Sequence, residues 1–162
     1  EEIYNIPLVA AGPGISCGER TQGRVGLHDL CPTLIELANA EPIVVPDSRS
    51  CAALLRDPSV CEREFTSGYA EYHGTRFPMA QRIYWQDVWK FVFNGFDYDE
   101  LYNLADDPAE MHNLVQDPEQ ADRIRDMMAQ VWTRIRQTGD RALFNSHYYS
   151  MRFAAVGPNT SQ

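Results

Sequence analysis

The apolar positions of the chain follow two different patterns, one before about residue 40 and one after about residue 65. Residues 7–11 form a short apolar run closed by a Gly-Pro-Gly turn, which is typical of a strand buried on both faces of a parallel sheet. A helix is predicted after it, with Asp29 as the N-cap and Pro32 in the first turn. The apolar face of this helix, which we expect to pack on the sheet, consists of Leu30, Leu34, Leu37 and Ala38.

Short segments rich in aromatic residues then predict an antiparallel meander. Its strands are expected at residues 65–72, 82–85, 89–93 and 100–104, with a tight turn at 86–88. A long helix is predicted over residues 118–137, and Gly139 ends it. The apolar stripe of this helix, which we expect to cover one face of the meander, comprises Ile124, Met128, Val131 and Ile135, widened by Met127 and Trp132.

These patterns predict an α/β fold class in two parts. Residues 1–40 are expected to form the edge of an α/β domain, and residues 65–140 a small subdomain of about four antiparallel strands and one long covering helix. Residues 41–64 are a connector with a short helical turn at 52–56, and residues 141–162 are an extension. Because a parallel strand needs neighbours on both sides, we expect a partner or a preceding portion to supply them.

Charge and hydropathy narrow the possible partners. Across 162 residues, 14 Lys and Arg stand against 23 Asp and Glu, which gives a net charge of −9. This balance opposes binding to a nucleic-acid backbone or to an anionic membrane surface, since both need clustered positive charge. No apolar run approaches the roughly 18 residues of a membrane span, so no span is predicted.

The cysteines leave two possibilities open. No two of them form a C-x-x-C pair, which argues against a zinc ribbon or zinc finger. Cys51 and Cys61 are spaced so that a disulfide between them would close a short loop in an exported protein. Free thiols in a reducing compartment are the alternative.

The polar pair best suited to an anionic ligand follows the first strand of the predicted meander. His73 can donate or shuttle a proton, and Arg76 offers a fork of donors. We therefore take His73 and Arg76 as candidate substrate-binding residues, with an ordinary surface turn as the alternative. Gln81 and Arg82 are predicted to be strand-edge residues, and Lys90 to cover aromatic surface with its ammonium in water.

Structural roles are favoured for the other polar groups and for the aromatic residues. His28 is expected to cap or pack, His112 to be exposed, and the Asp106-Asp107 pair to cap a helix. The carboxylates of residues 97–122 are spread over separate turns, which indicates a solvated face rather than a calcium site. The aromatic residues of the meander predict its core, with a sugar-binding platform as the lesser alternative.

Four motifs follow one another along residues 2–140. They are an apolar strand with a Gly-Pro-Gly loop (2–14), a D-x-x-P-T helix (25–38), an Asp-Ser-Arg-Ser segment (47–56) and the stretch E-L-Y-N-L-x-x-D-P-x-E-x-x-N-L (100–114). In this order they resemble the C-terminal part of a formylglycine-dependent sulfatase, a family of the alkaline-phosphatase superfamily. The third motif departs from the family's D-G-R-S-L pattern, with Ser48 for Gly and Cys51 for Leu.

The resemblance implies both a fold and a reaction. In the family an α/β sandwich carries the active site, and a smaller C-terminal subdomain holds antiparallel strands and a helix. The implied reaction is hydrolysis of a sulfate ester, as in a sulfuric ester hydrolase, on a sulfated small molecule or sugar. A formylglycine made from the cysteine of a C-x-P-x-R motif attacks sulfur, and a divalent metal, usually Ca²⁺, steadies the sulfate oxygens.

The machinery that the resemblance implies has no counterpart in the sequence. No cysteine stands in a C-x-P-x-R motif, and the family's Asp pair and other metal ligands are missing. We therefore expect no catalytic residue and no metal ligand here, in a C-terminal fragment that is inactive without an N-terminal catalytic portion. A phosphonate or phosphodiester hydrolase of the same superfamily and a non-catalytic interaction module are the alternatives. The sequence leaves the compartment open, because it is compatible with the cytoplasm, the periplasm and secretion.

Overall fold

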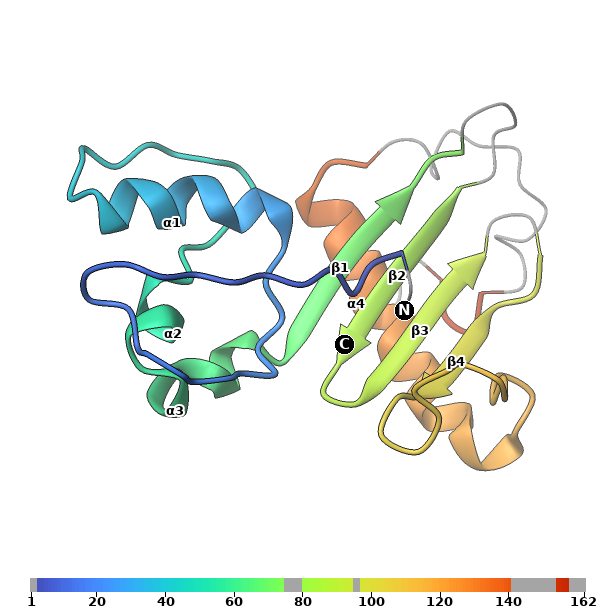
Figure 1. Ribbon diagram of the computed structural model, residues 1–162. Helices are drawn as coiled ribbons and strands as arrows, with labels where there is room; N and C mark the ends of the chain where they lie inside the picture. The colour runs from blue at the N-terminus through green and yellow to red at the C-terminus, as the bar shows by residue number, and fades with distance from the viewer. Residues whose placement is uncertain (1–2, 75–79, 95–96, 141–153, 158–162) are drawn as a thin grey trace. The chain divides into compact units, whose positions relative to one another are not determined.

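The computed structural model describes residues 3–74, 80–94, 97–140 and 154–157 (Figure 1). The chain divides into two compact units, residues 2–68 and residues 69–162. The helices of the first unit are η1 (Leu27–Asp29), α1 (Leu30–Leu37), α2 (Ala52–Arg56), α3 (Pro58–Cys61) and η2 (Glu62–Phe65). Its small core consists of the buried Cys51, Leu54 and Phe65, with the partly buried Val25 and Leu55 packed against them.

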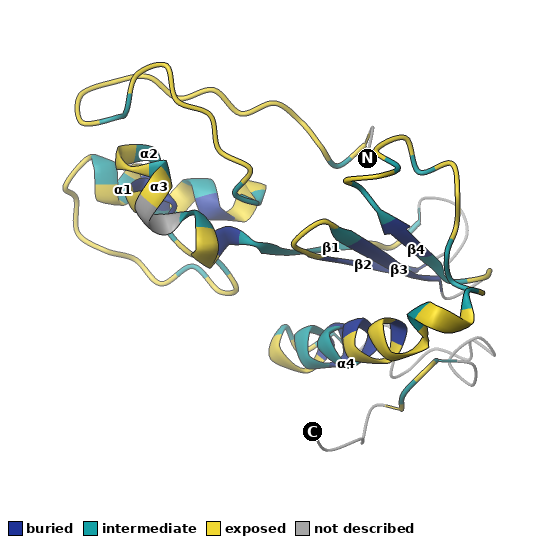
Figure 2. Cartoon of the chain, turned by 90° about the horizontal axis from the view of Figure 1, so that it is seen from below, coloured by how far each residue is buried: buried dark blue, intermediate teal, exposed yellow. Residues whose placement is uncertain are grey.

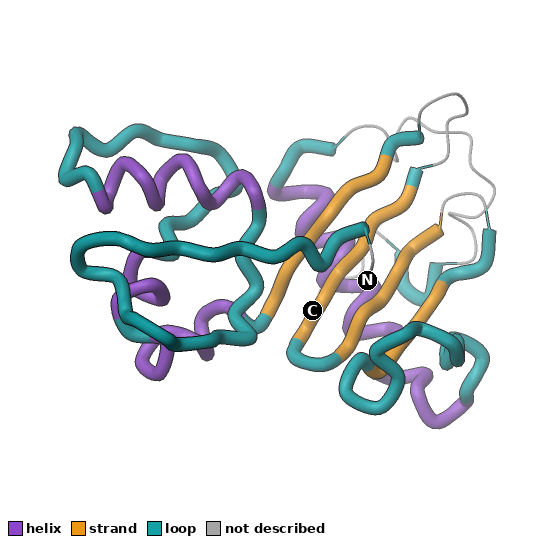
Figure 3. Tube along the Cα trace, viewed as in Figure 1, coloured by secondary structure: helices purple, strands orange, loops and turns teal. Residues whose placement is uncertain are grey.

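The strand predicted at residues 7–11 is absent from the structure. This segment is a loop (Figure 3), and the Val9 side chain is 90% exposed. A parallel strand needs hydrogen-bonding neighbours, and the described residues of this unit offer it none. The apolar sequence therefore stays extended without becoming part of a sheet.

The helix predicted after this segment forms, but its apolar face is not covered as expected. The α1 face of Leu30, Leu34, Leu37 and Ala38 contains no buried residue, and Leu34 is 64% exposed. The buried residue of α1 is Thr33, on the side that faces α2. The prediction that the apolar face packs on a sheet is therefore wrong for this chain, because the strand that would build that sheet has not formed.

The predicted meander is confirmed. Its strands are β1 (Ser67–Tyr72), β2 (Gln81–Gln86), β3 (Trp89–Asn94) and β4 (Glu100–Asn103), in the spatial order β1-β2-β3-β4. The pairs β2–β3 and β3–β4 are antiparallel. Gln86 pairs with Trp89, so the hairpin turn has only two residues, and Asp87 takes the left-handed conformation there, with φ of +51°.

The predicted helix is confirmed as the 3₁₀ turn η3 (Pro118–Gln120) followed by α4 (Ala121–Gln137). It covers one face of the sheet (Figure 2). Every residue of the predicted stripe is buried, from Ile124 at 9% exposure to Ile135 at 0%. Gly139 ends the helix with φ of +66°. The stripe packs on the inward residues of the strands, which are Tyr84, Phe91, Phe93 and Leu101.

Residues 154–157, the described part of the extension, join this core. Ala154 and Val156 pack against the cluster between α4 and the sheet. The indole Nε1–H of Trp132 donates to the Val156 carbonyl at 2.7 Å. Part of the extension therefore completes the second unit.

Candidate functional site

The first candidate residue, His73, lies directly after β1. Its ring is 53% exposed, and its Nε2 lies 2.9 Å from Oε2 of Glu71, a strand residue whose side chain is 27% exposed. Gly74 follows with φ of +74°, in the left-handed region that favours glycine. The other candidate, Arg76, lies outside the described residues. The structure therefore shows His73 beside a carboxylate and does not test its pairing with Arg76.

The motif residues of the first unit contact one another. The Asp29 carboxylate is buried and accepts hydrogen bonds from the Gly26 and Arg49 backbone amides, both at 2.9 Å. Asp29 occupies the predicted N-cap position of α1, but its side chain makes no capping bond to that helix. Burial explains this, because the carboxylate satisfies two donors from outside the helix instead. Asp29 thereby ties the D-x-x-P-T helix to the Asp-Ser-Arg-Ser segment.

Thr33 makes a second tie between the same two motifs. Its hydroxyl accepts from the Cys51 amide at 2.9 Å, and it lies 2.6 Å from the Asp29 carbonyl and 3.2 Å from the Cys51 sulfur. Cys51 is a fully buried free thiol. The disulfide with Cys61 that the sequence left open is therefore not formed.

Arg49 gathers backbone carbonyls around its guanidinium. It donates to the Glu64 carbonyl at 2.5 Å and to the carbonyls of Arg24 and Ser67 at 3.4 Å. The guanidinium also stacks on the Phe65 ring, 4.1 Å from its centroid. These contacts join three segments of the chain and give the Arg of the motif a structural role.

Glu36 on α1 closes this network at the surface. It accepts from the Ser50 hydroxyl at 2.5 Å and forms an ion pair with Arg56 at 2.7 Å. These two hydrogen bonds hold the pKa of Glu36 below its usual value. Ser50, the last residue of the Asp-Ser-Arg-Ser segment, thereby links α1 to α2.

In the second unit the longest motif closes the outer edge of β4. The Asn113 side-chain oxygen accepts from the Leu101 amide at 3.0 Å, and the Leu114 amide donates to the Leu101 carbonyl at 2.9 Å. Asp107 accepts from the amides of Met111 and His112, which hold its pKa below the usual value. The helix-capping role predicted for the Asp pair is wrong, because no helix lies between β4 and η3 in the described chain, and Asp107 instead holds the turn that follows it.

The environment of the Lys90 ammonium differs from the one predicted. Its ammonium is buried and forms an ion pair with Glu110 at 2.6 Å, and it lies 5.8 Å from the centroid of the Trp85 ring. The prediction of an ammonium in water is therefore wrong, because Glu110, the Glu of the D-P-x-E motif, reaches back to β3. The Glu110 backbone is left-handed, with φ of +56°.

Arg82 is the largest departure from the sequence prediction. β2 is an interior strand, and Arg82 is 0% exposed rather than an edge residue. Its Nε and Nη2 lie 2.7 and 2.6 Å from Oδ2 of Asp140, whose side chain is 5% exposed. Its Nη1 donates to the Gln81 carbonyl at 2.7 Å and to that of Tyr72 at 3.4 Å. This buried ion pair serves the core, not a ligand.

Asp99, just before β4, carries an unusual carboxyl group. Burial raises its pKa to about 6, against the lowering effect of a hydrogen bond from the Asn94 amide at 3.0 Å, and the neighbouring Glu100 raises it further. The Asn94 side chain in turn donates to Glu100 and to the Tyr98 carbonyl. The loop before β4 therefore holds one carboxyl that is partly ionised near neutral pH.

Replacing Asp99 by Asn is expected to stabilise the chain at pH 7 by about 1–2 kcal/mol. The folded state binds the Asp99 proton more tightly than the unfolded state, since its pKa is raised from 3.8 to about 6. Its contribution to stability is thus full below about pH 4 and is lost as pH rises through 6. The Asn variant keeps an acceptor for the Asn94 amide without the charge.

Urea unfolding at pH 4.5, 6 and 7.5 measures this difference, with Asp122→Asn, at an exposed carboxylate, as the control. The advantage of the Asp99 variant should grow with pH while the control stays level with the wild type. An advantage that does not change with pH would contradict the prediction.

The other sequence candidates take structural positions. The His28 ring is 52% exposed and lies 3.5 Å from the Asp29 carboxylate, and His112 is exposed, as predicted. His147 lies outside the described residues. The predicted aromatic core is confirmed for most of its members; those that are buried or pack on the core are Tyr69, Tyr84, Trp85, Trp89, Phe91 and Phe93.

Within the described ranges, no group of three or more His, Cys, Asp or Glu side chains is arranged to hold a metal ion. The residues that the structure describes therefore do not fit the divalent cation of the resembling family. No helix in the described part of the chain is both long and apolar enough to cross a bilayer.

Comparison with known proteins gives the same family as the motifs. The model of a family described as "N-sulphoglucosamine sulphohydrolase, C-terminal" matches residues 1–138. The uncharacterized sulfatase YidJ of Escherichia coli is 32% identical over 158 residues, which cover 94% of this chain and 30% of YidJ. Arylsulfatase K of Xenopus laevis is 26% identical over 173 residues, covering 98% of this chain and 32% of that protein.

Solved structures share the fold. The structure of BT1596, a 2-O GAG sulfatase, superposes with a TM-score of 0.68 at 21% identity and covers 94% of this chain, which spans 34% of that protein. BT4656, in complex with its substrate D-glucosamine-2-N,6-O-disulfate, gives a TM-score of 0.58 at 20% identity over 69% of this chain and 24% of that protein. The chain thus spans about a third or less of these sulfatases.

Proposed function

The chain belongs to the family of N-sulphoglucosamine sulphohydrolase C-terminal domains, and from this membership we propose that it serves as the C-terminal part of an enzyme that hydrolyses a sulfate ester. The observation that carries the proposal is the family match over residues 1–138, in which the motif residues make specific contacts with one another. Those contacts shape a scaffold and leave the reaction to groups outside the described residues.

The substrate proposed is a sulfated sugar. BT4656, which shares the fold, is bound to a doubly sulfated glucosamine, and His73 and Arg76 supply two side chains suited to a polar, anionic ligand. His73 is half exposed and follows a strand of the sheet, as residues that contact ligands often do. We propose these two residues as the contribution of this chain to substrate binding.

The reacting groups are proposed to come from a preceding portion of a longer protein. The sequence holds no C-x-P-x-R cysteine for conversion to formylglycine, and the described residues do not fit a calcium ion. A formylglycine and a divalent cation supplied by that portion would provide the nucleophile and the positive charge for the sulfate. This chain supports the domain that carries those two groups, and it contacts the substrate through His73.

The purified chain of 162 residues is therefore expected to show no hydrolysis of 4-nitrophenyl sulfate, with or without added Ca²⁺. The gene should continue upstream and encode a C-x-P-x-R motif with an Asp pair. The full reading frame, expressed with a formylglycine-generating enzyme, should release sulfate from D-glucosamine-2-N,6-O-disulfate.

Two results would contradict the proposal. Metal-dependent turnover by the chain alone would place the catalytic groups within it. Hydrolysis of a phenylphosphonate or a phosphodiester by the full protein, in preference to the sulfate ester, would show the related phosphonate or phosphodiester hydrolase instead.

A further inference from the structure

We propose that Glu71 is a positioning residue that fixes the proton of His73 on Nε2 and turns Nδ1 toward a hydroxyl group of the sugar. This inference rests on the proposed function and adds to it a second residue and the substrate group that is recognised. Its starting point is the contact between His73 Nε2 and Glu71 Oε2 at 2.9 Å.

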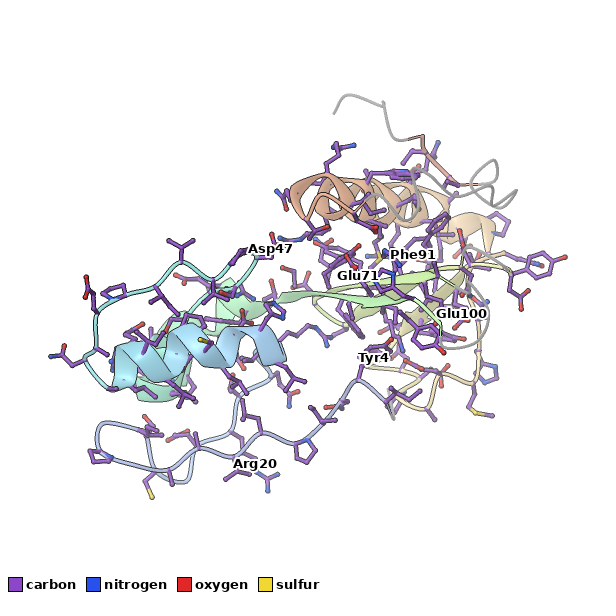
Figure 4. All side chains as sticks on the ribbon, turned by 90° about the horizontal axis from the view of Figure 1, so that it is seen from above. Tyr4, Arg20, Asp47, Glu71, Phe91 and Glu100 are labelled. Atoms are coloured by element: carbon purple, nitrogen blue, oxygen red, sulfur yellow. The ribbon has the colours of Figure 1, made fainter. Side chains whose placement is uncertain are left out.

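The strand sets the face of the sheet on which Glu71 lies. Residues two apart in a strand point to the same face, so Glu71 follows Tyr69 on the face that α4 covers. Figure 4 shows Glu71 on this side of the sheet together with Phe91, and Glu100 on the other side. Glu71 thus extends a row of inward-facing residues toward the exposed end of β1, where His73 lies.

The backbone between the two residues is anchored to the core. The carbonyl of Tyr72, which separates Glu71 from His73, accepts a hydrogen bond from Arg82 at 3.4 Å. Arg82 is fully buried and is held by Asp140 at 2.6 Å. The end of β1 is therefore fixed by a buried ion pair, which limits the positions that the Glu71 carboxylate can take.

The chemistry of the pair decides which ring nitrogen carries the proton. An ionised carboxylate only accepts hydrogen bonds, so Nε2 must be the donor in its contact with Glu71. In the neutral ring, Nδ1 is then an acceptor. Within the part of the chain that the structure describes, Nδ1 makes no hydrogen bond, and the ring is 53% exposed. A sugar hydroxyl is the donor that fits it.

Orientation is the role that the exposure of the pair supports. An exposed ion pair contributes little to stability, because water screens it and two side chains lose freedom. A carboxylate behind a histidine instead fixes the ring orientation and the tautomer, as such outer partners do at metal sites. Glu71 is thus expected to affect substrate recognition more than folding.

The first experiment is made on the chain as it is, without substrate. Long-range ¹H–¹⁵N spectra of the histidine rings at pH 8 should show His73 with its proton on Nε2, assigned by its loss in His73→Asn. In Glu71→Ala both ring nitrogens should shift toward the average of the two tautomers. Glu71→Gln, whose amide oxygen still accepts, should restore most of the wild-type pattern, and Asp122→Ala should change nothing.

The second experiment measures kcat/KM in the full sulfatase with two substrates. His73→Ala should lower hydrolysis of D-glucosamine-2-N,6-O-disulfate roughly 10- to 100-fold and lower that of 4-nitrophenyl sulfate, which has no sugar hydroxyl, by a much smaller factor. Glu71→Ala should lower the sugar reaction about fivefold. In the His73→Ala background the Glu71 change should add nothing, since Glu71 acts through His73.

The outcomes separate this inference from the proposed function. Identical ring spectra for the wild type and Glu71→Ala, or a Glu71 effect that persists without His73, would overturn the inference while the sulfatase stands. An equal loss with both substrates in His73→Ala would overturn the hydroxyl contact. No sulfate release by the wild type from either substrate would overturn the proposed function, and the spectra would still report on the pair.

Discussion

Replacing Asp140 by alanine is expected to destabilise the second unit by about 3–5 kcal/mol. Asp140 neutralises Arg82, which is 0% exposed, through contacts of 2.6 and 2.7 Å. Without Asp140 a guanidinium charge stays buried with no counter-charge at that place, or the sheet opens to hydrate it. Thermal and urea unfolding of the chain, followed by circular dichroism, measures the loss.

Two further variants make this prediction specific. The double variant Arg82→Met, Asp140→Leu replaces the ion pair by apolar side chains of similar size, and it should recover most of the lost stability. Asp122→Ala breaks an ion pair with Arg125 whose side chains are 90% and 54% exposed, and it should cost less than about 0.5 kcal/mol. A double variant as unstable as Asp140→Ala would show that the pair is not the cause.

Replacing Trp132 by alanine is the second large effect, with an expected cost of about 3–5 kcal/mol. Trp132 is 1% exposed, and its ring lies 6.1 Å from that of Phe93, centroid to centroid, in the layer between α4 and the sheet. The truncation leaves a cavity and also removes the donor to the Val156 carbonyl. Urea unfolding measures the total effect.

Trp132→Phe divides this effect into packing and hydrogen bonding. The variant keeps an aromatic ring in the core and loses the Nε1–H, so it should cost less than Trp132→Ala and the ¹³C signal of the Val156 carbonyl should move. Met111→Ala, at a side chain that is 73% exposed, serves as the control and should be neutral. An unchanged Val156 signal would contradict the contact between α4 and the extension.

Much of the second unit can be predicted from the sequence because its signals are local. The stripe of Ile124, Met128, Val131 and Ile135 has one helical period, and all four residues are buried in the structure. The strands lie in the sheet in the order in which they follow one another along the chain, and a turn of two residues joins β2 to β3. In the second unit, the pattern of apolar residues along the chain therefore agrees with the contacts seen in the structure.

The predictions that failed depend on contacts between distant residues. Arg82 is a charged residue in a strand, which alone favours an exposed edge, and only Asp140, 58 positions later, makes its burial possible. Lys90 has its partner 20 positions away in the same manner. The strand expected at residues 7–11 does not form for the opposite reason. Its apolar pattern suits a buried strand, but the neighbouring strands that it requires are absent from the described chain.

One residue of the candidate site can be predicted from the sequence, and the other cannot. His73 can be chosen from its residue type and its place after a strand, whereas Glu71 carries no signal of its own in the sequence. An acidic residue near the end of a strand, two positions before a histidine, is the pattern that would have pointed to it, because two such side chains are close enough to form a contact.

The contacts of Asp140 and Val156 have a consequence for where this domain ends as a folding unit. The family match stops at residue 138, yet Asp140 supplies the counter-charge of a buried arginine and Val156 accepts a hydrogen bond from a buried tryptophan. The segment that the family model matches is therefore shorter than the segment that closes the core. A chain divided at residue 138 would lose both contacts together.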